Sequence, residues 1–212
     1  MGRGRGTPAG LNAEVLRQAV LEVADTDGLD AVSVRNVARH LGVEAMSIYH
    51  WYPNKDALLA AAWDEIVCQL DPDALSTQAS WQDYASAFAD QLHGQLLQHP
   101  NALPIMLGRH VSTPESMTVI DRVVASLHQR GLSYASAVDV VNTLSMFTMA
   151  HALNEYALPR RQTPAPDPEA HPALCAALAE GIPSGPAVDL DHFRHGVAAL
   201  INAACCEALL CR

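Results

Sequence analysis

Residues 33–52 read SVRNVARHLGVEAMSIYHWY, and this stretch predicts two short helices that meet at a tight turn. Ser33 can cap the first helix. The buried side of that helix would carry Val34, Val37, Ala38 and Leu41. Gly42 permits a sharp turn, and the second helix is expected from about Glu44 to Trp51. The pattern is that of a helix-turn-helix unit.

The second of these helices is expected to carry the residues that meet a binding partner. Its outward side would consist of Ala45, Met46, Ser47, Tyr49 and His50. In helix-turn-helix proteins the second helix enters the major groove of DNA and contacts base edges. Ala45 and Met46 can contact thymine methyl groups but cannot read guanine or adenine edges. Sequence reading would therefore depend more on Tyr49 and His50, together with the shape of the DNA.

Two neighbouring features extend this interpretation. Lys55, the only lysine in the chain, follows Asn54 at the expected start of the next helix. A lysine beside the unpaired N–H groups of a helix start makes a phosphate-binding site. Trp51 and Tyr52, by contrast, are expected to pack inward, because a helix this short must bury one side to be stable.

Composition predicts an all-α protein. Half of the 212 residues are hydrophobic but only 5% are aromatic, and a chain rich in alanine and leucine favours helices over strands. Apolar periodicity and helix-boundary residues predict further helices at about 11–27, 54–70, 80–98, 101–108, 114–130, 134–157, 170–180 and 189–211. No apolar run approaches the roughly 20 residues of a membrane span, so no membrane association is expected.

The charges divide the chain into two unequal parts. Residues 1–55 hold six of the 13 basic and six of the 23 acidic residues, so the net charge of −10 lies entirely in residues 56–212. We interpret residues 1–55 as a three-helix DNA-binding domain that begins with a flexible arm at 1–10. Residues 56–212 would form a larger helical domain. The neutral part can approach a polyanion, whereas the acidic part repels one.

Other chemistry-bearing residues point away from catalysis and metal binding. The five cysteines form no zinc-like pairs, which indicates reduced thiols in the cytoplasm. No nucleophile elbow, phosphate loop or zinc-protease motif occurs, so no catalytic residue and no cofactor are expected. His151 and Glu155 share a helix face, as do His192 and His195. Two ligands make no metal site without a third, and we interpret these as surface histidines.

The run from Gly28 to Leu59, GLDAVSVRNVARHLGVEAMSIYHWYPNKDALL, resembles the N-terminal domain of the tetracycline-repressor (TetR) family of transcriptional regulators. Residues 80–83 and 129–137 resemble, more weakly, the ligand-binding half of the tetracycline repressors themselves. The resemblance implies DNA contacts by a set of residues around the turn. They are Ser33, Arg35, Ala45, Met46, Ser47, Tyr49, His50 and Lys55.

The resemblance also implies a homodimer. In the family, two helices from each subunit form a four-helix interface, and the matching segments here are 137–153 and the last predicted helix. The last helix has a broad apolar stripe, formed by Phe193, Val197, Leu200, Ile201, Ala204, Ala208 and Leu209.

A small-molecule pocket is implied as well. Candidate lining residues are Trp63, Phe88, Leu92, Met106, His110, Met117, Phe147 and His151. The tetracycline repressors hold a magnesium–drug complex with polar and histidine groups. At those positions this chain offers Asp71, Phe88, Leu92, Met106, Arg109 and Val123. Met106 replaces the metal-binding histidine unless a gap brings His110 there, so magnesium–tetracycline is not the expected effector.

These observations favour a ligand-responsive transcriptional regulator. Its simplest form is a repressor that binds a palindromic double-stranded DNA operator as a homodimer and is released by a small-molecule effector. Two alternatives stay open: a helical protein-interaction module and a metal-responsive regulator. The choice between repressor and activator also stays open, because it depends on where the operator lies.

Overall fold

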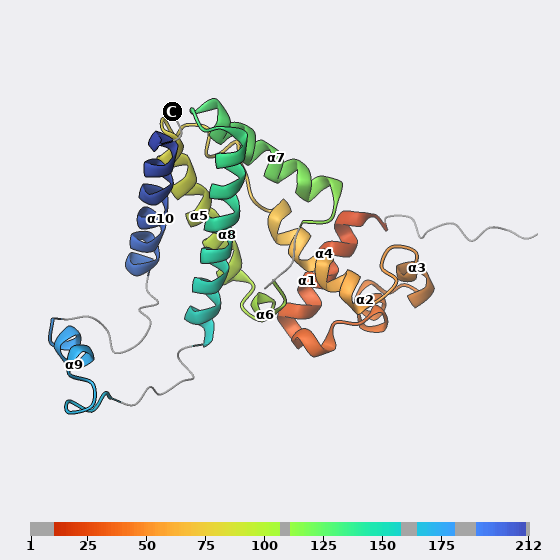
Figure 1. The fold of residues 1–212 in the computed structure, drawn as a ribbon. Helices are drawn as coiled ribbons and strands as arrows, with labels where there is room; N and C mark the ends of the chain where they lie inside the picture. Colours follow the sequence, from red (N-terminus) through yellow and green to blue (C-terminus); the bar gives the residue numbers. More distant parts are fainter. Residues whose placement is uncertain (1–10, 107–110, 158–164, 181–189, 211–212) are drawn as a thin grey trace, which may run out of the picture.

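The computed structural model describes residues 11–106, 111–157, 165–180 and 190–210, whose arrangement is shown in Figure 1. Within these ranges every regular element is a helix, as the composition predicted. The elements are α1 (Ala13–Asp27), the 3-10 helix η1 (Leu29–Ala31), α2 (Val34–Leu41), α3 (Ala45–Tyr49), α4 (Lys55–Cys68), α5 (Trp81–Gln98), α6 (Leu103–Met106), α7 (Pro114–Gln129), α8 (Tyr134–Ala157), α9 (Pro172–Ala179) and α10 (Leu190–Leu210). The predicted arm at 1–10 lies outside the described residues.

The predicted helices agree closely with the observed ones, because several helix starts carry a capping side chain that the sequence reveals. Ser33 caps α2 as predicted and accepts a hydrogen bond of 3.2 Å from the backbone N–H of Asn36. Asn54 caps α4 in the same way, with a bond of 2.9 Å from the N–H of Ala57. At α6, where a helix was predicted over 101–108, the helical residues are Leu103–Met106, and residues 107 and 108 lie outside the described part.

The first three helices form a small unit that α4 closes. α1 packs on α2 and α4, and α3 packs on α2. Their shared core consists of side chains with no exposed surface, among them Leu16, Val20, Val37, Ile48 and Leu58. Burying a side chain of this size stabilises a fold by about 1.5 to 3 kcal/mol. This packing is what holds α3, since five residues are too few for a helix that is stable by itself.

α4 connects this unit to the rest of the chain. Leu58, Ala62 and Ile66 are buried along its length, and Leu70, two residues after its end, is buried as well, as their four-residue spacing predicted. α4 packs against both α1 and α7. The helix is therefore shared by the two parts of the chain, and the proposed division at residue 55 stays a prediction.

The remaining long helices form the body. α5, α8 and α10 pack on one another at the end of the molecule opposite α3, and α7 lies between this group and α4 (Figure 1). Phe88 of α5, Leu144 of α8 and Phe193 of α10 are buried in their common core. Within the described residues, no helix combines the length and the apolar character needed to cross a membrane.

The apolar stripe predicted on the last helix faces its own chain. Phe193, Val197 and Ile201 of α10 are at most 4% exposed, because they pack against α5 and α8. Leu200 and Ala204 lie partly buried beside them, and the side chains of the last two stripe residues, Ala208 and Leu209, lie outside the described part. Phe193, Val197 and Ile201 therefore belong to the core of their own chain, and the use of α10 in a subunit interface stays a prediction.

Candidate nucleic-acid interface

The turn between α2 and α3 has the geometry that its sequence predicted. Gly42 adopts a left-handed conformation (φ 66°, ψ 30°), which is readily accessible to a residue without a Cβ atom. Its N–H donates to the carbonyl of Arg39 at 3.2 Å, and the N–H of Val43 donates to that of Ala38 at 2.9 Å. Ile48, which has no exposed surface, anchors α3 from the other side. These contacts fix the direction in which α3 projects.

α3 presents most of its predicted reading residues to solvent. Met46 is 65% exposed and Tyr49 is 46% exposed, and His50 directly after the helix is exposed as well. Ala45 and Ser47 are half-buried. Figure 1 shows α3 at the edge of the molecule, with no helix of the body over it. The side of α3 that the sequence assigned to DNA is thus open to a partner.

Positive charges flank this face. Arg35 on α2 and Lys55, the first residue of α4, are both exposed. Neither forms an ion pair among those found in the described part of the chain, and both therefore present a full charge to an approaching phosphate. Ser33 is half-buried, and its hydroxyl is already used to cap α2. A phosphate contact by Ser33 would have to share that hydroxyl.

Trp51 and Tyr52, both expected to pack inward, behave differently. Tyr52 packs partly buried against the core, and burial raises the pKa of its phenol to about 12, although the positive charge of Arg17 acts in the opposite direction. Trp51 is 42% exposed, so the prediction of inward packing is wrong for this residue. The reason is geometric: α3 ends at Tyr49, and the chain then turns so that only Tyr52 faces the core.

A buried carboxylate joins α4 to the start of α7. Asp64, which has no exposed surface, accepts a hydrogen bond of 2.9 Å from the backbone N–H of Ser112. It also accepts bonds from the hydroxyls of Ser112 and Ser116. Thr113 caps α7 and exchanges hydrogen bonds with Ser116, so the carboxylate is tied to the first turn of that helix.

Arg17 makes a second connection between the same parts. It is only 4% exposed, and its guanidinium lies 3.2 Å from the carboxylate of Glu65 on α4 and 3.6 Å from that of Glu115 on α7. A movement of α7 would shift Glu115 relative to Arg17 and so affect α1 and α4. The reason is that the energetic cost of a buried charge depends strongly on its ion-pair partners.

The candidate pocket residues do not form one group. Trp63, Phe88 and Leu92 are at most 5% exposed and belong to the hydrophobic core. Met117 of α7 is 51% exposed and so is not enclosed with these residues in the single chain, and its place in a pocket stays a prediction. His110, the side chain of Met106 and Arg109 lie outside the described residues.

Phe147 and His151 do lie together, in a cluster that the sequence did not reveal. His151 is 6% exposed, so its interpretation as a surface histidine is wrong. It lies beside His93 of α5, with ring centroids 5.5 Å apart, and Glu155 is hydrogen-bonded to His93 at 3.0 Å. His93 is the residue that sequence reasoning missed. Its only local signal is a position next to Leu92 on a buried helix face.

Two family models match the chain. Residues 16–62 match the model of the bacterial regulatory proteins of the tetR family, and residues 74–202 match the model of the tetracyclin repressor-like C-terminal domain. Curated relatives include the tetracycline repressor protein class D of Escherichia coli, 29% identical over 175 residues that cover 80% of this chain and 79% of the relative. The transcriptional repressor DrrR1 of Streptomyces coeruleorubidus is 24% identical over 151 residues, which cover 71% of this chain but only 56% of the relative.

Solved structures share the fold. ActR of Streptomyces coelicolor in complex with (S)-DNPA superposes with a TM-score of 0.73 at 23% identity, over 94% of this chain and 100% of that one. A TetR variant from Acinetobacter baumannii AYE in complex with minocycline gives a TM-score of 0.66 at 20% identity, over 91% of this chain and 92% of that one. At such identities the likeness extends to the fold alone.

Proposed function

Since the chain belongs to the tetR family of bacterial regulatory proteins, we propose that it is a ligand-responsive repressor that binds a palindromic operator as a homodimer. Membership makes it a transcriptional regulator rather than an enzyme. The observation that carries the proposal is the exposure of α3, with Met46 and Tyr49 outward and Ile48 as the buried anchor. Binding to the operator would take place in the cytoplasm.

The DNA contacts divide by chemistry. Arg35 and Lys55 supply charge for phosphates, and Arg35 can also reach a base edge. Tyr49 and His50 supply hydrogen-bonding groups at the exposed end of α3, while Met46 offers apolar contact to a thymine methyl group. Ala45, Ser47 and Ser33 are less exposed, and their contacts would be made at the edges of the groove.

The homodimer would use the side of α8 and α10 that the chain itself does not cover. On α8 this side includes Val138, Asn142, Met146 and Ala150, and on α10 it includes Ala198, Ala199, Asn202 and Ala203. The exposed positions recur three or four residues apart, so each helix has a continuous outer face. Small side chains allow a second pair of helices to approach closely.

A single substitution tests the dimer. Met146 is 68% exposed in the isolated chain, and Met146→Asp would place a charge in the centre of the proposed interface. Sedimentation equilibrium should show a dimer for the wild type and a monomer for this variant. Met117→Asp, on the exposed side of α7, is the matched control and should remain dimeric. A Met146→Asp protein that dimerises like the wild type would exclude this face.

The effector would bind in the body and act through α7. Relatives of the same fold bind organic molecules, minocycline in one case and (S)-DNPA in another. Here the helix that would line such a pocket contributes Phe88 and Leu92, which suits a ligand less polar than magnesium–tetracycline. An effector that binds better to a conformer with α7 displaced would favour that conformer. Because Asp64 and Arg17 contact the start of α7, its displacement would reorient α1 and α4.

Mobility-shift titrations test the DNA-binding proposal. The wild type should bind a duplex from the region upstream of its own gene more tightly than a scrambled duplex of equal length. Arg35→Ala combined with Tyr49→Ala should remove this preference, whereas Arg122→Ala combined with Tyr134→Ala, two exposed positions of the body, should not. Binding that ignores sequence and survives the first pair of substitutions would contradict the proposal. No shift of any duplex would favour the protein-interaction module instead.

A further inference from the structure

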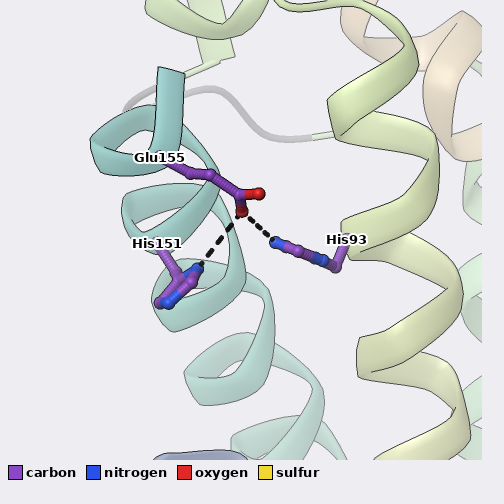
Figure 2. Close-up of side chains that lie close together, drawn as sticks. All are labelled: His93, His151 and Glu155. Carbon is purple, nitrogen blue, oxygen red and sulfur yellow. Dashed lines mark hydrogen bonds and ion pairs between the residues drawn. The ribbon is translucent and has the colours of Figure 1, made fainter. Parts of the chain in front are cut away.

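Three metal-binding side chains converge between α5 and α8. His93 comes from α5, and His151 and Glu155 come from successive turns of α8 (Figure 2). The Oε2 atom of Glu155 lies 3.0 Å from Nε2 of His93 and 3.9 Å from Nδ1 of His151. One potential ligand atom from each residue lies within 4.8 Å of the other two. His93 thus supplies the third potential ligand that the sequence did not reveal for the pair His151 and Glu155.

The surroundings fix two of these groups and leave the third accessible. The side chains of His93 and His151 are each 5% exposed, whereas that of Glu155 is 32% exposed. Phe193 of α10 stacks on the His93 ring, with centroids 4.2 Å apart and planes 16° from parallel. The ring of Phe147 lies 6.0 Å from that of His151. The imidazoles are therefore held in an apolar setting, while solvent can reach the carboxylate.

We propose that His93, His151 and Glu155 bind a divalent transition-metal ion, of which Zn²⁺ and Co²⁺ are the best matched. Imidazole and carboxylate ligands suit these ions. In a tetrahedral site with bonds of about 2.0 to 2.1 Å, ligand atoms lie roughly 3.3 Å apart. The two distances to Glu155 lie on either side of that value and the potential ligand nitrogens of the two imidazoles lie within 4.8 Å of each other, so binding would require rotations of the side chains. Three protein ligands leave a fourth position for water or for an effector group.

The hydrogen bond between His93 and Glu155 is a feature of the metal-free state of the protein. Binding of the ion would break this bond, because Nε2 of His93 must present a lone pair to a metal ion. A purely structural role for the cluster would be a buried hydrogen bond packed against Phe193. The two roles differ in one measurable respect: only the first gives stoichiometric uptake of metal.

A short path leads from this site to the DNA-binding end, and its relevance to regulation rests on the proposed function. Tyr156, the residue after Glu155, donates a hydrogen bond of 3.1 Å to the side-chain oxygen of Asn101. The amide nitrogen of Asn101 donates at 2.7 Å to the backbone carbonyl of Asp25 on α1. An ion that holds Glu155 against His93 would bias the end of α8, and through these bonds the position of α1.

Titration of the chelator-treated full-length protein with Co²⁺ tests the site without any DNA. The wild type should bind one ion per chain and develop the visible absorption of tetrahedral Co²⁺, which Zn²⁺ then abolishes. A thiolate charge-transfer band should not appear, since no cysteine is among the ligands. Glu155→Gln and His93→Gln should each weaken binding by at least about tenfold. Glu155 is partly exposed, so its variant should fold like the wild type, as thermal unfolding would verify.

His195→Gln is the matched control, because His195 is an exposed histidine of α10 outside the cluster. It should bind Co²⁺ like the wild type. The absence of stoichiometric binding, or equal binding by wild type and Glu155→Gln, would overturn the site. Either result would leave the regulator proposal intact, since that proposal is tested on DNA.

Operator affinity tests the regulatory consequence. Saturating Zn²⁺ should change the affinity of the wild type for its operator by about fivefold or more. Tyr156→Phe removes the bond to Asn101 and leaves the three ligands in place. This variant should bind the ion normally but show a smaller effect of the ion on operator affinity. Normal metal binding with no change in operator affinity would overturn the role as an effector site.

Discussion

The carboxylate of Asp64, in the middle of α4, accepts a hydrogen bond of 2.9 Å from the backbone N–H of Ser112, two residues before α7 begins. The bond crosses from the helix that closes the DNA-binding unit to the helix that contacts the body. Because Asp64 is fully buried and also accepts bonds from two hydroxyls, it has the contacts needed to hold the two parts in one relative position.

Asp64→Ala should lower the free energy of unfolding by about 2 to 4 kcal/mol, because it leaves several buried donors without an acceptor. Urea denaturation measures this loss. Asp139→Ala, at an exposed position of α8, is the control and should change stability by less than about 0.5 kcal/mol. If both variants unfold like the wild type, Asp64 does not hold α4 to α7.

The contact between α8 and α10 gives a second prediction. A Cβ atom added to Gly196 would clash with Cζ of Phe147, so an alanine there would force the phenyl ring away from its stack with Phe193. Gly196→Ala should destabilise the protein by about 1 to 3 kcal/mol.

Gly94 of α5 provides the opposite case. A Cβ atom added to Gly94 would have nothing within 4 Å of it, so Gly94→Ala should raise the free energy of unfolding by up to about 1 kcal/mol through helix propensity alone. Urea denaturation measures the change in the free energy of unfolding for both Gly196→Ala and Gly94→Ala. Equal effects of the two substitutions would mean that α8 and α10 are not in close contact.

Local signals predicted much of this structure, and packing between distant segments determined the rest. Gly42, Ser33 and Asn54 act on their own turns, so the helix-turn-helix geometry could be predicted from neighbouring residues. The periodicity of α10 showed an apolar stripe but not that α5 and α8 cover it.

Likewise, no pattern within α8 shows that His93 will meet Glu155, because the two residues are 62 positions apart. The register between α5 and α8 alone brings them together. Trp51 shows that local sequence does not always predict burial, even within a single motif. Trp51 and Tyr52 have similar sequence signals, but only Tyr52 faces the core.

Tyr52 predicts a dependence of stability on pH. Burial raises the pKa of its phenol to about 12 in the folded protein, whereas the unfolded value is about 10. The neutral phenol therefore contributes stability that is complete below the unfolded pKa and is lost as the pH rises from about 10 to 12. Urea midpoints of wild type and Tyr52→Phe should differ in slope across that window, because the variant has no phenol to ionise.

Tyr134→Phe, on the exposed surface of α8, is the matched control for this titration and should follow the wild type. Parallel curves for wild type and Tyr52→Phe between about pH 10 and 12 would show that Tyr52 is not buried as described.

Lys55 predicts the salt dependence of DNA binding. Each phosphate contact contributes about 0.9 to the slope of log affinity against log salt concentration. In a dimer, Lys55→Ala should therefore reduce the slope by roughly 2 and weaken operator and non-operator duplexes alike. Fluorescence anisotropy at several salt concentrations measures both the slope and the affinities for the two duplexes. An unchanged slope would mean that Lys55 does not contact phosphate.

The central claim is that two copies of α3, one from each subunit, sit in successive major grooves of one operator. Hydroxyl-radical footprinting of the wild type on the DNA upstream of its gene tests this directly. We predict two protected half-sites related by a two-fold axis, with centres separated by about 10 base pairs or a multiple of that distance, and loss of both in the Arg35→Ala, Tyr49→Ala double variant. A single protected half-site, or uniform protection that the double variant retains, would contradict the account.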